Sequence, residues 1–136
     1  MDNELVSACK KAETVYIYGA GTVADFVFLF LKQNQIEEKV ESFVVTKLGG
    51  NVSTKFGREI GELSERIEEL RKNLVIVAVQ QFIQEEIVNI LRENQIHDYF
   101  CIDPEELLND FYRELYREPI KGNKILFQNQ SGVGYG

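Results

Sequence analysis

The chain has 136 residues, of which 44% are hydrophobic and 27% charged, as in an ordinary globular domain. This length suits one domain with a buried core. The net charge of −7 argues against a surface that binds nucleic acid. Two cysteines, Cys9 and Cys101, and one histidine, His97, are too few for a metal-ligand cluster and fit a reducing cytoplasm. No run approaches the roughly 18 apolar residues of a membrane span.

The most informative stretch is residues 15–24, Val-Tyr-Ile-Tyr-Gly-Ala-Gly-Thr-Val-Ala. A β-forming run, a glycine turn and a helical pattern follow one another with the spacing G-x-G-x-x-A. Gly19 allows a tight turn, Gly21 lets a phosphate approach the backbone, and Ala24 lets helix and strand pack closely. The free N–H groups and the helix dipole then form an anion site. The alternative is a tight turn in a Rossmann-like domain that binds nothing.

Hydrophobic periodicity predicts alternating helices and strands along the chain. Because strand–helix–strand connections are right-handed crossovers between parallel strands, we expect a three-layer, Rossmann-like α/β domain. Its mostly parallel sheet has helices on both faces. The strand order stays open between the Rossmann and flavodoxin arrangements. We expect helices at residues 2–12, 22–33, 63–71 and 82–94 and after the Asp103-Pro104 cap, and strands at residues 14–18, 40–46, near 60, 74–79, 99–102 and 124–128.

The helix at residues 22–33 is apolar around nearly its whole circumference, with the run Phe-Val-Phe-Leu-Phe-Leu at residues 26–31. A surface helix shows a single apolar stripe. We therefore expect a second cover besides the sheet. We favour a terminal helix of the same chain, and a homodimer is the alternative. Cys101 lies in an apolar strand, where we expect it to be buried.

The loop at residues 47–58 contains three glycines and the basic residues Lys47, Lys55 and Arg58, with no acid. Two interpretations are equally open. The loop is solvated, or it is a basic flap over a phosphate-bearing ligand, because the second strand ends beside the glycine turn in this fold.

Dinucleotide-binding domains usually end their second strand with Asp or Glu, which holds the ribose hydroxyls. This chain has Thr46 and Lys47 there, which argues against ordinary NAD binding. Gln80 and Gln81 follow the apolar strand at residues 74–79; they either contact a base or sugar or cap the next helix. The candidate nucleotide-binding residues are Gly19, Ala20, Gly21, Thr22, Thr46, Lys47, Gln80 and Gln81. We identify no catalytic constellation, and His97 reads as a lone surface histidine.

Four segments together resemble small Rossmann-like domains of bacterial surface-polysaccharide enzymes, which are related to nucleoside-diphosphate-sugar epimerases. They are Tyr-Gly-Ala-Gly-Thr-Val-Ala at 18–24, Phe-Val-Val-Thr at 43–46, Val-Ile-Val-Ala-Val at 75–79 and Gln-Glu-Glu-Ile at 84–87. The resemblance covers roughly residues 14–108 and implies a nucleotide or nucleotide-sugar ligand. The Tyr-x-x-x-Lys pair of true epimerases is missing, because Tyr112 is followed at the fourth place by Tyr116, and Tyr116 by Ile120. We therefore expect no epimerase activity.

The segment Lys-Ile-Leu-Phe-Gln-Asn-Gln-Ser-Gly-Val-Gly-Tyr-Gly at 124–136 resembles the start of the transferase domain of CDP-glycerol glycerophosphotransferase-like proteins, which make teichoic acid. This resemblance divides the chain into a nucleotide-binding domain at 1–122 and the start of a following domain at 123–136. It implies a parent protein that transfers glycerol phosphate or a related group to a cell-surface polymer. That family's catalytic residues lie beyond residue 136.

These observations predict a non-catalytic nucleotide- or nucleotide-sugar-binding module of a surface-polysaccharide transferase. We expect a cytoplasmic location, at the inner membrane face only through the parent protein. The expected partners are a nucleotide-type small molecule and the following transferase domain, without nucleic acid. The alternative function is a structural or oligomerising domain with a vestigial site. A separate NADP-dependent enzyme ranks last, because the chain has no room for a substrate domain.

Overall fold

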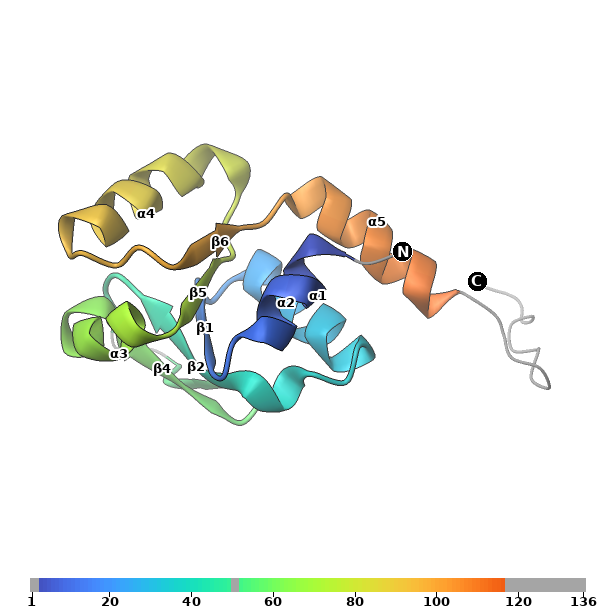
Figure 1. Ribbon diagram of the computed structural model, residues 1–136, viewed down its shortest axis with the longest axis horizontal. Helices are drawn as coiled ribbons and strands as arrows, with labels where there is room; N and C mark the ends of the chain where they lie inside the picture. The colour runs from blue at the N-terminus through green and yellow to red at the C-terminus, as the bar shows by residue number, and fades with distance from the viewer. Residues whose placement is uncertain (1–2, 50–51, 117–136) are drawn as a thin grey trace.

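The computed structural model describes residues 3–49 and 52–116, and the predicted strand at 124–128 and boundary at 122/123 lie outside them. A six-stranded sheet has the order β3-β4-β2-β1-β5-β6 (Figure 1). The strands are β1 (Val15–Tyr18), β2 (Val40–Val45), β3 (Thr54–Lys55), β4 (Arg58–Glu62), β5 (Leu74–Val77) and β6 (Tyr99–Cys101). The α-helices are α1 (Glu4–Lys11), α2 (Thr22–Gln33), α3 (Ile67–Lys72), α4 (Gln81–Glu93) and α5 (Pro104–Leu115), with short 3-10 turns η1 (Glu37–Lys39) and η2 (Leu63–Glu65).

The strand pairing decides between the two arrangements left open by the sequence. Neighbouring strands are parallel except for β3, which pairs antiparallel with β4 at one edge. Counted along the chain without β3, the parallel strands have the Rossmann order 3-2-1-4-5. The order reverses between β1 and β5, and ligands of open α/β sheets bind beyond the carboxyl ends of the strands at such a point.

The helices form two layers, one on each face of the sheet. In Figure 1, α1, α2 and α5 lie to the right of the strands, and α3 and α4 lie to the left. Strand β1 shows how the sequence produces this arrangement: Val15 and Ile17 pack toward the first layer, and Tyr16 and Tyr18 toward the second. Because both faces are covered, all four residues are buried. The expected three-layer α/β fold is confirmed.

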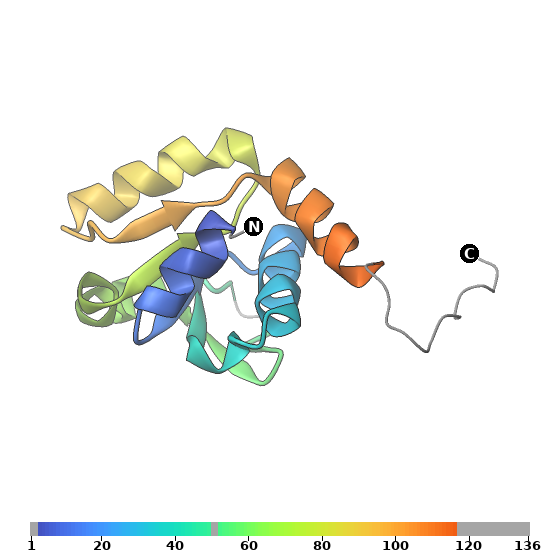
Figure 2. The ribbon, with the colours of Figure 1, turned by 45° about the vertical axis from the view of Figure 1, so that its right-hand side comes forward.

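The all-round apolar character of α2 is explained by α5. The inner side of α2 packs on the sheet, while α5 runs alongside its outer side (Figure 2). The Phe26 and Phe111 rings meet edge to face with centroids 5.4 Å apart. The amide Nε2 of Gln33 donates a hydrogen bond of 3.0 Å to the carbonyl oxygen of Phe111. The preferred intrachain cover is therefore confirmed.

The loop predicted at residues 47–58 is more structured than expected. Thr54 and Lys55 form β3, which makes a hairpin with β4, so the short step near residue 60 is one strand of a pair. The Phe56 ring stacks on Phe28 with centroids 4.5 Å apart. The Arg58 guanidinium lies 4.9 Å from the Phe28 ring centroid. These aromatic contacts bind the hairpin to α2.

Helix α1 is fastened at both ends. At its start, the Asn3 side chain accepts hydrogen bonds from two backbone N–H groups of the first turn and donates one of 2.6 Å to Asp110 on α5. At its end, the Lys39 ammonium donates to the carbonyl oxygens of Cys9, Lys10 and Ala12 at 3.2, 2.8 and 2.7 Å. A cation at this position also complements the negative end of the helix dipole.

The two cysteines differ in exposure, which corrects the expectation for Cys101. Cys9 is buried in the core, but Cys101 is exposed. Cys101 ends β6, the edge strand of the sheet, where covering by helices is incomplete. An apolar run predicts burial only for a strand with covered faces, and an edge strand does not meet this condition.

We predict that Cys9 makes the fold sensitive to alkali. Burial raises the pKa of its thiol from 9.0 to about 12, with a smaller opposing effect of Lys39. Below pH 9 the thiol is protonated in both the folded and the unfolded state, and the free energy of unfolding does not depend on it. Between pH 9 and 12 only the unfolded thiol ionises, so the free energy of unfolding falls as the pH rises, by at most about 1.4 kcal/mol per pH unit. Urea unfolding of wild type and Cys9→Ala from pH 8 to 11 measures this.

Cys9→Ala is expected to flatten the pH dependence without abolishing it, because burial also raises the pKa values of Tyr16 and Tyr18. Cys101→Ala is the matched control: Cys101 is exposed, and burial raises the pKa of its thiol less than that of Cys9, so this variant should flatten the pH dependence less. Identical pH profiles for wild type and Cys9→Ala would contradict the prediction.

Candidate functional site

The predicted site residues gather at one edge of the sheet. Because β2, β1 and β5 are adjacent and parallel, their carboxyl ends lie side by side. Gly19, Ala20, Gly21 and Thr22 follow β1, Thr46 and Lys47 follow β2, and Gln80 and Gln81 follow β5. The glycine turn lies at the point where the strand order reverses, which is where this fold type binds ligands.

Gly19 is the fixed point of this turn. Its φ of +128° is rarely adopted by residues with a side chain, and a Cβ added to it would lie 2.5 Å from the carbonyl oxygen of Ala78. The Gly19 N–H donates a 2.7 Å hydrogen bond to the Val44 carbonyl, and the Ala78 N–H donates one of 2.9 Å to the Tyr18 carbonyl. The end of β1 is thus held between β2 and the continuation of β5.

Gly21 is the open position of the turn. It is the N-cap residue of α2, no side chain caps this helix start, and a Cβ at Gly21 would have nothing within 4 Å. The first N–H groups of a helix have no intrahelical partners, and they carry its positive dipole end. Gly21 and Thr22 are both exposed. A phosphate-sized anion can therefore approach these backbone donors.

A neighbouring ion pair sets the electrostatics of this helix start. Asp25 lies in the first turn of α2, and its Oδ1 is 2.6 Å from Nζ of Lys55 on β3. The pair is partly exposed, with 37% of the Asp25 side chain and 21% of the Lys55 side chain accessible. Lys55 thus offsets a carboxylate that would otherwise oppose an incoming anion.

The basic residues of the hairpin therefore match neither of the two loop interpretations in full. The hairpin does approach the first turn of α2, but the Lys55 charge is engaged by Asp25. Arg58 donates hydrogen bonds to the carbonyl oxygens of Val40 and Glu37 at 3.1 and 2.8 Å, and so links β4 to β2 and η1. Lys47 is exposed beyond the end of β2 and remains a candidate for ligand contact.

Thr46 has a partner that sequence reasoning missed. Its Oγ1 is hydrogen-bonded to the Tyr18 hydroxyl, which ties the ends of β1 and β2 on the face that α3 and α4 cover. Burial raises the pKa of Tyr18, the Thr46 hydrogen bond lowers it, and the charge of Glu86 raises it. Tyr18 therefore stays protonated at neutral pH. The alternating pattern of β1 buries Tyr18, but it gives no sign of a partner 28 residues away.

The side chains of Gln80 and Gln81 do not cap α4, which was one of the two roles predicted for them. Gln80 is the N-cap residue of α4, yet its side chain makes no capping hydrogen bond, and both Gln80 and Gln81 are exposed. The structural glutamine is Gln84, which is buried and donates to the carbonyl oxygens of Val79 at 3.1 Å and Ile102 at 2.7 Å. The sequence feature that could have indicated this role is the position of Gln84, a polar residue, on the side of α4 that faces the core.

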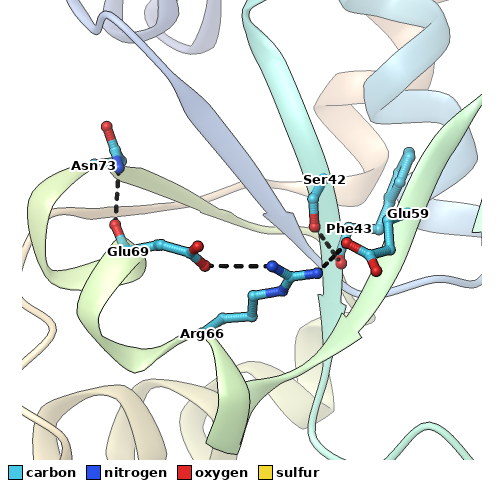
Figure 3. Close-up of polar contacts among 6 residues, drawn as sticks. All are labelled: Ser42, Phe43, Glu59, Arg66, Glu69 and Asn73. Carbon is cyan, nitrogen blue, oxygen red and sulfur yellow. Dashed lines mark hydrogen bonds and ion pairs between the residues drawn. The ribbon is translucent and has the colours of Figure 1, made fainter.

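A charged cluster near α3 has a structural explanation. Figure 3 shows the Arg66 guanidinium between the carboxylates of Glu59 and Glu69. A Cβ on Gly61 would collide with the Arg66 side chain, so glycine makes room for the guanidinium. Burial lowers the pKa of Arg66, but the hydrogen bond and charge of Glu59 and Glu69 outweigh this and raise it. Arg66 therefore forms ion pairs with neighbouring acids, and we assign it a structural role and not a ligand-binding one.

Two hollows lie beside α1 and α5, away from the glycine turn. The smaller has a volume of about 180 Å³, and the larger, of about 1110 Å³, is lined mainly by polar and acidic residues of the two helices. Within residues 3–49 and 52–116, no group of three or more His, Cys, Asp or Glu residues is placed to bind a metal ion. None of the described helices has the length and apolar character to cross a membrane. His97 is exposed, as expected.

No protein-family model matches the chain, and no curated protein matches it.

We predict that alanine substitution at the two turn glycines changes the free energy of unfolding by very different amounts. Gly19→Ala should lower the free energy of unfolding by about 2–5 kcal/mol, because it combines an unfavourable φ with a collision against the Ala78 backbone. Gly21→Ala should change it by less than about 0.5 kcal/mol, because the added methyl group meets open space. Urea unfolding of both variants measures the difference. Equal losses would show that the turn is not held as described.

Proposed function

We propose that this chain is a nucleotide- or nucleotide-sugar-binding module whose ligand diphosphate lies at the glycine turn. The observation that carries the proposal is the arrangement at Gly21: an exposed, uncapped α2 N-terminus with open space in front of it, at the reversal of strand order. Backbone N–H groups there suit phosphate oxygens and need no side-chain chemistry.

The surrounding side chains favour a nucleotide other than NAD. The position after β2 that usually carries an acid for the ribose hydroxyls is occupied by Thr46 and Lys47. Thr46 bonds to Tyr18, so Lys47 is left to contact a ligand phosphate at this end. Gln80 and Gln81 are exposed after β5, where an amide can hydrogen-bond a base or a sugar. CDP- and UDP-linked ligands fit this set.

We place the module in a bacterial surface-polysaccharide transferase of the CDP-glycerol glycerophosphotransferase-like kind, as in teichoic-acid synthesis. The support is the resemblance of roughly residues 14–108 to Rossmann-like domains of surface-polysaccharide enzymes, and of residues 124–136 to the start of the glycerophosphotransferase-like transferase domain. In this setting the module is cytoplasmic and non-catalytic. The following transferase domain supplies the catalytic residues and the link to the inner membrane face.

A second candidate is a structural or interaction domain with a vestigial site. The observation in its favour is the Asp25 carboxylate in the first turn of α2, which adds negative charge where a phosphate would bind. Lys55 offsets that charge but is itself no longer available to the ligand.

A thermal-shift screen separates the two candidates. The chain is heated with CDP-glycerol, UDP-sugars, CMP, NAD or NADP. A ligand at 100 times its Kd stabilises by about 2.7 kcal/mol, which raises Tm by roughly 10 °C for a domain of this size. We expect a shift with CDP- or UDP-linked compounds and none with NAD. No shift with any compound would reject nucleotide binding and favour the structural role.

Gly21→Asp is the variant that locates the ligand. We expect it to abolish the ligand-induced shift, because its carboxylate occupies the phosphate position and repels the ligand. The unliganded fold should be retained, because Asp is a favoured N-cap residue and its side chain enters open space. Gly21→Ala is the matched control and should retain most of the shift. An undiminished shift for Gly21→Asp would place the ligand elsewhere.

A further inference from the structure

The outer side of α5 carries an apolar stripe. Leu108, Tyr112, Leu115 and Tyr116, here called the α5 outer stripe, are 37%, 44%, 53% and 77% exposed. Their spacing of i, i+4, i+7 and i+8 places them on one side of the helix. Single exposed apolar residues are ordinary, whereas an aligned set at the surface is typical of an interaction site.

The stripe is an extension of the core rather than an isolated patch. The adjoining side of α5 is already buried through Leu107 and Phe111 against α2. The Tyr112 ring lies 6.3 Å from that of Phe26 on α2 and stacks on Tyr116 at 6.3 Å with an interplanar angle of 15°. The aromatic contacts therefore continue from α2 to the end of α5 and leave their last members exposed. A further segment packed there would complete them.

We propose that the α5 outer stripe is covered by the continuation of this same chain, through the apolar residues Ile125, Leu126 and Phe127. Helix α5 ends at the outer edge of the molecule (Figure 2), and the stripe residues Leu115 and Tyr116 lie at that end of the helix. Ile125 is nine positions after Tyr116 in the sequence, and an extended chain of that length reaches up to about 30 Å. The stripe from Leu108 to Tyr116 is only about 12 Å long. The segment is therefore long enough to turn back along α5.

Charge favours this occupant. Residues 117–127 carry Arg117, Lys121 and Lys124 against a single acid, Glu118. The first turn of α5 presents exposed Glu105 and Glu106. A returning segment would bring its lysines toward these acids, and a basic segment suits an otherwise acidic chain.

A second copy of the chain is the competing occupant, and connectivity decides against it. A segment tethered by a few residues has an effective concentration in the millimolar range, far above that of a second copy in dilute solution. Two copies would also bring together two chains of net charge −7. The inference is independent of the proposed nucleotide site, because none of its residues lies at the glycine turn. Residues 125–127 belong to the segment that the proposed function assigns to the start of the following domain, so the inference places the first residues of that domain against α5.

Limited trypsin digestion of the 136-residue chain tests the proposal. Docking should slow cleavage after Lys121 and Lys124, measured by mass spectrometry against a free peptide of the same sequence. Leu115→Asp should raise the cleavage rate about tenfold, the effect of removing an interface anchor. Because Leu115 is 53% exposed, this variant should keep its fold, which circular dichroism checks. Phe127→Ser should raise cleavage equally without altering α5.

Asn109→Asp is the matched control, since it adds the same charge to α5 at an exposed polar residue beside the stripe without removing an apolar contact, and it should leave the rates unchanged. Cleavage of wild type as fast as of the free peptide would overturn the proposal. So would protection that neither Leu115→Asp nor Phe127→Ser reduces. Protection that grows with protein concentration, with a dimer in sedimentation, would assign the stripe to a second copy and overturn it as well.

Discussion

The close approach of Gly19 to the Ala78 carbonyl is the constraint on which the candidate site depends. Only a residue without Cβ fits between β1 and the continuation of β5 while turning the chain at a positive φ. This contact lets two strands diverge toward opposite helix layers immediately beyond their ends. The exposed start of α2 follows directly after this tightly packed backbone contact, at the point where the strand order reverses.

A second constraint follows from the composition of α2. Its apolar residues cover more of the circumference than a sheet can bury, so the domain needs a further helix layer on that side. Helix α5 supplies it through Phe111, and the hydrogen bond from Asn3 to Asp110 ties α1 to the same helix. The outer side of α5 also carries apolar residues that a further layer could cover. They are continuous with the core, because Tyr112 contacts both Phe26 and Tyr116.

Local sequence signals predicted the fold because each acts over a few residues. The glycine turn, the apolar strands and the Asp103 cap, which accepts hydrogen bonds from two N–H groups of α5, depend on neighbours along the chain. The exposure of Cys101 was mispredicted, because it depends on β6 lying at the edge of the sheet. Strand order is likewise a property of the whole chain.

The candidate site was predicted as a location rather than as a set of contacts. Its backbone part, Gly19 to Thr22, follows from spacing alone. The pairs Tyr18–Thr46 and Asp25–Lys55 join residues 28 and 30 positions apart, and no periodicity indicates such distant partners. These pairs change the assignment of roles: Thr46 and Lys55 are engaged within the protein, whereas Lys47, Gln80 and Gln81 stay exposed.

The balance of charge at the start of α2 bears on the kind of ligand that the turn would accept. Asp25 and Lys55 together are nearly neutral, so attraction for an anion there comes from backbone dipoles and not from a fixed excess of cations. Backbone donors recognise phosphate oxygens without distinguishing one nucleotide from another. Discrimination would then fall to the exposed side chains after the two neighbouring strands: Lys47 after β2, where the ribose-binding acid usually stands, and Gln80 and Gln81 after β5. A site of this kind would select its ligand by the groups attached to the diphosphate, and far less by the diphosphate itself.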